Sequence, residues 1–125
     1  MDLITIDEIC KFLKFGNFEF LPTQSKICFP IIQQIYYKMK LGVEFENINI
    51  DEKLLIDGHH RYLCSLLLNR NLATNVWSSP SNIHIYQWGQ IQIDAIDWES
   101  VEIIQRHNLK DAAKSGLDIE LFVKI

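Results

Sequence analysis

The chain of 125 residues has no closely spaced pair of cysteines and no long apolar run. Its three cysteines, Cys10, Cys28 and Cys64, are far apart, odd in number and set among apolar residues. This argues against a disulfide framework and against a paired-cysteine metal site, and it predicts reduced thiols packed in a core. No stretch approaches the roughly 20 apolar residues that cross a membrane, and the acidic start shows no secretory signal. The sequence therefore predicts a cytoplasmic protein that does not enter a membrane.

Basic residues are also in short supply. The chain has 12 Lys and Arg against 16 Asp and Glu, which gives a formal net charge of -4. A general nucleic-acid binder needs an excess of basic side chains, because these displace the counterions of the phosphate backbone. Nucleic acid is therefore an unfavoured partner, whereas an acidic surface suits contact with a basic protein.

Several common active-site motifs are absent. The sequence contains no phosphate-binding P-loop, no GxGxxG fingerprint and no GxSxG nucleophile turn. The H-x3-H spacing of a helical metal site is missing as well, and the adjacent His59 and His60 would point about 100° apart on a helix. We therefore predict no metal site built by the protein alone.

What the chain does contain is enough apolar material for one core. Hydrophobic residues make up 48% of the sequence, close to the average for globular proteins, and no linker or internal repeat divides it. We expect a single domain over residues 1–125.

Helical patterns recur along the chain. We expect helices at residues 7–15, capped by Thr5 or Asp7 and ended by Gly16; from Pro30 to Gly42; from His59 or His60 to Asn69; and at 98–107, capped by Asp97, with one more turn at 110–115 before Gly116. Strand-like stretches lie between and around them, at 3–6, 18–21, 45–50, 54–56, 73–77 and in the tail 117–125. Ile83, Ile85, Ile91 and Ile93 predict one or two further strands around Gly89, with a hairpin as one arrangement. The order predicts a mixed α/β (α+β) domain in which helices flank a small mixed sheet.

The most informative stretch is Asp57-Gly58-His59-His60-Arg61, which follows the apolar residues 54–56 and opens a helix. The first amides of a helix have no internal partners, and they bind anions readily. Gly58 lets the backbone approach a ligand, and Arg61 offers a planar fork of donors to phosphate oxygens. His59 and His60 can donate hydrogen bonds or carry protons, and Asp57 can act as a base or hold a metal-bound water. The alternative is that Gly58 only makes a turn and Asp57 only caps a helix.

The residues LLIDGHHRYLCSLLL (54–68) resemble the signature of the ParB/sulfiredoxin-like superfamily, and the order of elements over residues 22–68 is similar. The resemblance implies a small α/β fold in which this turn binds a nucleotide such as ATP, ADP or CTP with Mg²⁺. In that arrangement Gly58, His60 and Arg61 would hold phosphates, and Asp57 and His59 would be the catalytic residues.

The chain also departs from that superfamily. Sulfiredoxins carry a nucleophilic cysteine in this turn, where this chain has His59, so sulfinic-acid reduction is not expected. Partition proteins add a helix-turn-helix region, for which 125 residues leave no room. Their arginine-bearing upstream motif is replaced by residues 22–26, and we predict that Gln24, Ser25 and Lys26 form a second wall of the pocket.

Two hypotheses follow, and the sequence leaves open whether the protein is an enzyme. The first is a nucleotide-dependent phosphotransferase or NTPase. The second is a ParB-like scaffold without catalysis, an immunity or accessory protein that neutralises a bacterial toxin by direct binding. Two features allow that second use, although they more commonly reflect core packing and a solvated face, respectively. They are the aromatic residues Trp77, Tyr86, Trp88 and Trp98, and the acidic residues Asp94, Asp97, Glu99 and Glu102.

Overall fold

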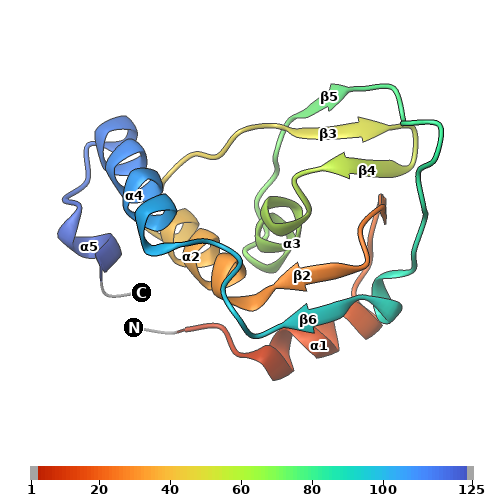
Figure 1. The fold of residues 1–125 in the computed structure, drawn as a ribbon, viewed down its shortest axis with the longest axis horizontal. Coiled ribbons are helices and arrows are strands. Elements are labelled where there is room, and N and C mark those ends of the chain that lie inside the picture. The colour runs from red at the N-terminus through yellow and green to blue at the C-terminus, as the bar shows by residue number, and fades with distance from the viewer. Residues whose placement is uncertain (1–2, 124–125) are drawn as a thin grey trace.

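Two small sheets with helices around them make up the structure, a computed structural model that describes residues 3–123 (Figure 1). The first sheet has the strand order β1-β4-β3-β5, and β3 and β4 are antiparallel while the other two pairs are parallel. The second sheet joins β2 and β6 in parallel. The strands are β1 (Leu21–Pro22), β2 (Lys26–Cys28), β3 (Ile48–Asp51), β4 (Leu54–Asp57), β5 (Thr74–Val76) and β6 (Gln92–Asp94). The predicted mixed α/β fold is confirmed.

The helices are α1 (Ile6–Phe15), α2 (Phe29–Lys40), α3 (His59–Leu67), α4 (Val101–Ser115) and α5 (Glu120–Val123), with a 3₁₀ turn η1 (Trp88–Gln90). Thr5 caps α1 in a reciprocal arrangement with Glu8, and Gly16 ends it, both as predicted. Pro30 lies in the first turn of α2, where its missing N–H costs nothing. The expectation for α4 was wrong at its start: Ser100, and not Asp97, caps it, and it runs unbroken to Gly116.

The core lies between α1, α2, α3 and the strands. Ile9, Ile32, Leu55 and Leu63 are each fully buried, one from each of α1, α2, β4 and α3. Trp88 is also buried, and its indole Nε1 donates to the carbonyl of Phe20 at 2.7 Å, so that η1 closes the core against α1. Leu54 and Ile56 are only partly buried, so β4 is fully covered on one face and not on both as predicted.

The cysteines are free, as expected from their spacing. Cys28 and Cys64 are buried, and Cys10 is half-buried. Burial raises the pKa of the Cys64 thiol, so Cys64 is a packing residue and not a nucleophile.

Several predicted strands are wrong for identifiable reasons. Residues 3–6 form no strand because Thr5 caps α1. Pairing begins only at Leu21, since the rings of Phe18 and Phe20 turn into an aromatic cluster with Tyr62 and Trp88. No hairpin forms around Gly89, because β6 pairs with the distant β2. The tail forms the short helix α5 with Phe122 buried; residues 124–125 of the predicted tail strand lie outside the described residues. None of the helices in residues 3–123 has the length and hydropathy that a bilayer crossing requires.

Candidate functional site

The turn between β4 and α3 is built around a left-handed glycine. Gly58 has φ of 95°, a conformation that side chains with a Cβ adopt only under strain. A Cβ placed there would lie 2.8 Å from Arg61 Nη2 and 2.8 Å from Ile48 Cγ2. Glycine therefore lets the chain reverse tightly from strand to helix while the Arg61 side chain lies against its backbone.

The N-terminus of α3 carries no side-chain cap. The side chains of Thr5 and Ser100 cap α1 and α4, whereas α3 begins from Gly58, which has no side chain to offer. The first-turn amides of His59, His60 and Arg61 have no acceptor within the helix, and the helix dipole adds partial positive charge there. This terminus can therefore accept an anion from outside.

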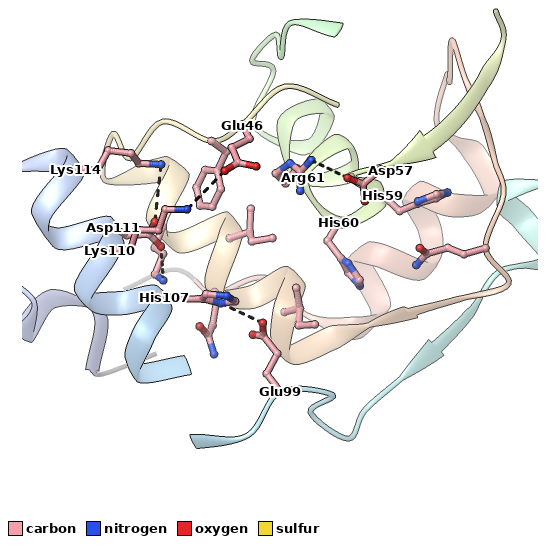
Figure 2. A pocket seen from close by; sticks show the side chains of 17 residues that line it. Glu46, Asp57, His59, His60, Arg61, Glu99, His107, Lys110, Asp111 and Lys114 are labelled. Carbon is pink, nitrogen blue, oxygen red and sulfur yellow. Dashed lines mark hydrogen bonds and ion pairs between the residues drawn. The ribbon is translucent and has the colours of Figure 1, made fainter. Parts of the chain in front are cut away.

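A pocket of about 330 Å³ opens at this terminus (Figure 2). Residues 57–61 and Gln24 form one side of it. Two helical stripes with the spacing i, i+3, i+4, i+7 line the rest, Ile31, Gln34, Ile35 and Lys38 on α2 and His107, Lys110, Asp111 and Lys114 on α4, together with Phe45, Glu46 and Glu99. The volume is at the lower end of the range for small-molecule sites.

Arg61 lies at the edge of this pocket and is only partly engaged. Its Nη2 donates to the Asn47 carbonyl at 3.1 Å and lies 3.8 Å from a carboxylate oxygen of Asp57. Its Nε is buried and has no partner among the described residues. The side chain is 20% exposed, so the guanidinium is held in place while it still has donors to offer.

His59 and His60 hold the neighbouring chain segments in place through hydrogen bonds to their backbone. His59 Nε2 accepts the backbone N–H of Thr23 at 3.0 Å, and His60 Nε2 accepts that of Cys28 at 2.9 Å. Both rings must therefore be neutral, with the proton on Nδ1. Burial, and to a smaller extent the charge of the next residue, His60 or Arg61, lower the pKa of each ring to about 4. The two rings thus fix the segment before β2 and the start of α2 against α3.

Asp57 differs from the two histidines, because its side chain is 62% exposed. One of its oxygens accepts from the Asn49 amide at 3.3 Å, and the same oxygen faces Arg61. The carboxylate therefore keeps free lone pairs at the mouth of the pocket.

The structure brings together six of the eight predicted site residues: Gln24, Asp57, Gly58, His59, His60 and Arg61. Ser25 and Lys26 are exposed and do not belong to the described residues that line this pocket. Glu19, a further acidic side chain near the start of the chain, lines a different cavity.

The sequence reasoning missed both helical stripes. The signal was present, since residues 107, 110, 111 and 114 fall on one face of a helix. The stripe on α4 was not expected because residues 98–107 and 110–115 were predicted as two separate helical pieces. Glu99, which the sequence groups with a solvated acidic face, is a pocket residue, and its carboxylate lies 3.1 Å from His107 Nδ1.

The three tryptophans do not form one cluster. Trp88 is a core residue, whereas Trp77 and Trp98 are 53% and 46% exposed. Trp98 packs nearly perpendicular to the ring of His60, and its indole Nε1 donates to the Asp94 carboxylate at 2.8 Å.

Among the described residues no group of three or more His, Cys, Asp or Glu side chains is arranged to hold a metal ion. Comparisons with known proteins found no protein family, no curated protein and no solved structure that matches the chain. The resemblance to the ParB/sulfiredoxin-like superfamily thus stays a prediction that depends on residues 54–68.

Proposed function

We propose that the chain is a phosphate-binding domain that takes a nucleotide or another small phosphorylated molecule at the N-terminus of α3. The observation that supports this is the position of the pocket of about 330 Å³ directly at the uncapped first turn, beside Gly58 and Arg61. A phosphate there would accept from the free amides and from the unused guanidinium donors.

The hydrogen bonds that hold the turn and its neighbours in place support the same proposal. An anion site is effective when its donors are held in place before the ligand arrives, because little reorganisation is then needed. His59 and His60 hold two chain segments against the turn, and Arg61 is held by Asn47 and Asp57. The donors that would bind phosphate are therefore arranged in advance.

A magnesium ion fits this site as a companion of the phosphate. Mg²⁺ is commonly held by one or two carboxylates together with phosphate oxygens and water. The exposed Asp57 carboxylate is suitable as the protein ligand, and the ion would neutralise phosphate charge.

Phosphoryl transfer or hydrolysis is a second step of the proposal and depends on Asp57. The Nε2 atoms of both histidines are occupied by backbone N–H groups, so neither can take a proton there without losing its hydrogen bond. Asp57 has free lone pairs and could accept the proton of an incoming hydroxyl or water.

Thermal unfolding in the presence of phosphate, AMP, ADP, ATP, CTP and GTP, each with and without Mg²⁺, tests the binding. A ligand at 100 times its Kd stabilises the fold by about 2.7 kcal/mol, which raises Tm by several degrees. We expect at least one phosphorylated compound to do so, and Arg61→Ala to weaken the effect by roughly tenfold in Kd.

Arg106→Ala is the matched control, because Arg106 is exposed on α4 and lies outside the pocket. It should bind as the native chain does. If no compound raises Tm, or if both arginine variants behave alike, the phosphate site is wrong.

A second candidate is the immunity or accessory protein, and one surface favours it. Ile96, Trp98 and Val101 are 76%, 46% and 65% exposed, in the same segment as the acidic Asp94, Asp97 and Glu102. Apolar anchors with an acidic surround suit a basic protein such as a toxin. Tight binding of a basic partner that is lost in Trp98→Ala, without any nucleotide effect on Tm, would favour this function.

A further inference from the structure

Two basic side chains on the α4 side of the pocket have no role in the phosphate site proposed at residues 57–61. Lys110 and Lys114 lie one turn apart on α4 and line the same pocket as Gly58 and Arg61. Figure 2 shows them on the side of the pocket opposite Asp57, with Glu46 between them and Arg61. The pocket therefore has donors or positive charge at both ends.

Neither lysine is committed to a buried ion pair as its main contact. Lys110 Nζ lies 3.7 Å from Glu46, and the two side chains are 69% and 76% exposed. This exposed pair contributes little to stability, so a ligand anion can replace Glu46 at little cost. Lys114 Nζ donates to the Glu44 carbonyl and lies 3.9 Å from Asp111, and its side chain is 39% exposed. An ammonium group has three donors, so Lys114 can bind an anion while it keeps its contact with Glu44.

Lys38 lines the same pocket but differs from these two lysines, because it forms a buried ion pair. Its side chain is 3% exposed and its Nζ lies 2.8 Å from Asp111. Since Asp111 is engaged with Lys38 at this short distance, it offers Lys114 only the weaker contact. Lys110 and Lys114 are thus the positive charges on this side that still have donors for a ligand.

The space between the ends is larger than one phosphate needs and is partly apolar. Ile31, Ile35 and Phe45 line it, and the Phe45 ring centre lies 5.4 Å from Lys114 Nζ. A phosphate alone would leave this apolar surface in contact with water. A ligand with an uncharged body would cover it and reach the lysines.

We propose that Lys110 and Lys114 form a second anion subsite, so that the pocket selects small molecules with anionic groups at both ends over molecules with one. The inference rests on the proposed function, because the first anion occupies the N-terminus of α3. The expected ligand class is a bisphosphate, or a phosphate ester with a distant carboxylate, on a sugar-sized body.

Paired titrations at low salt test the second subsite. Fructose 1,6-bisphosphate is compared with fructose 6-phosphate, and adenosine 3′,5′-bisphosphate with AMP. For at least one pair we expect the native chain to bind the bisphosphate at least tenfold more tightly. The variant with Lys110→Gln and Lys114→Gln should reduce that preference to less than threefold, and Lys110→Gln alone should reduce it in part.

Arg106→Gln removes a positive charge from the same helix outside the pocket and should keep the full preference. If monophosphates bind but no preference exists, or if it survives the double substitution, the second subsite alone is overturned. If neither class binds the native chain, the proposed function fails and the second subsite with it. A circular dichroism spectrum and Tm of each variant confirm that its fold is intact.

Discussion

At the scale of single residues, Gly58 is the position in the turn that tolerates a side chain least. Its φ of 95° and the absence of room for a Cβ both exclude a side chain. We predict that Gly58→Ala lowers the free energy of unfolding by about 1–2 kcal/mol through backbone strain, and by more if Ile48 cannot shift. It should also displace Arg61 and weaken phosphate binding by about tenfold. Urea unfolding and a phosphate titration measure the two effects.

Gly89→Ala is a suitable control for that experiment. Gly89 lies in η1, has no left-handed φ, and a Cβ there would meet no atom within 4 Å. The substitution should change stability by less than about 0.5 kcal/mol, as is usual at open surface positions. Equal losses in both variants would show that the tight approach of Arg61 and Ile48 to Gly58 has no energetic consequence.

His59 and His60 give the protein a definite pH dependence. The pKa of each ring falls from an ordinary 6.5 to about 4 in the folded chain, because both rings are buried. The unfolded chain therefore binds more protons between these values, and stability is complete above pH 6.5 and declines toward pH 4. We predict a loss of roughly 3 kcal/mol for each histidine over that interval, measured by urea unfolding at several pH values.

An exposed histidine serves as the reference for this measurement. His84 is exposed, so His84→Gln should leave the pH dependence unchanged. A free energy of unfolding that stays constant from pH 7 to pH 4.5 would contradict the roles of His59 and His60 as neutral acceptors.

At the scale of elements, the buried pair of Lys38 and Asp111 joins α2 to α4. Lys38 Nζ lies 2.8 Å from the carboxylate and 5.2 Å from the ring centre of Phe122 in α5. Asp111→Asn would leave Lys38 charged and buried without its partner, and such changes cost about 3–5 kcal/mol. We expect a loss of this size in chemical denaturation, and a smaller one when Lys38→Met and Asp111→Leu are combined.

Glu46→Gln is the control for Asp111→Asn, because it removes a carboxylate from an exposed ion pair and not from a buried one. It disrupts the exposed pair with Lys110 and should change stability by less than about 1 kcal/mol. If Asp111→Asn proves equally mild, the buried pair does not hold α4 in place.

The elements that sequence patterns predicted well are those with local signals. Thr5 and Gly16 fix the ends of α1, Pro30 marks the start of α2, and the apolar stretch before Asp57 marks β4. The pairing of strands was not predictable where the partners lie far apart in the sequence. Ile93 in β6 pairs with Ile27 in β2, and no local pattern carries that information.

At the scale of the whole molecule, the turn was predictable and the pocket was not. Residues 57–61 are contiguous, so their chemistry can be read directly from the sequence. The opposite wall comes from α4, some 50 positions later, and it is placed by the β2–β6 ladder and the Lys38–Asp111 pair. Contacts over such separations depend on tertiary packing, which propensity and capping do not encode.

The way α4 is attached has a consequence for how the specificity of such a protein can change. In the proposed site, the first anion would be held beside Gly58 and His59, where a Cβ at position 58 has no room and the histidine is buried. Lys110 is largely exposed and Lys114 partly so, on a helix whose buried residues, Asn108 and Asp111, are different ones. Ligand preference can therefore drift through changes at positions 110 and 114 without loss of the scaffold, so related chains could keep one turn and recognise different molecules.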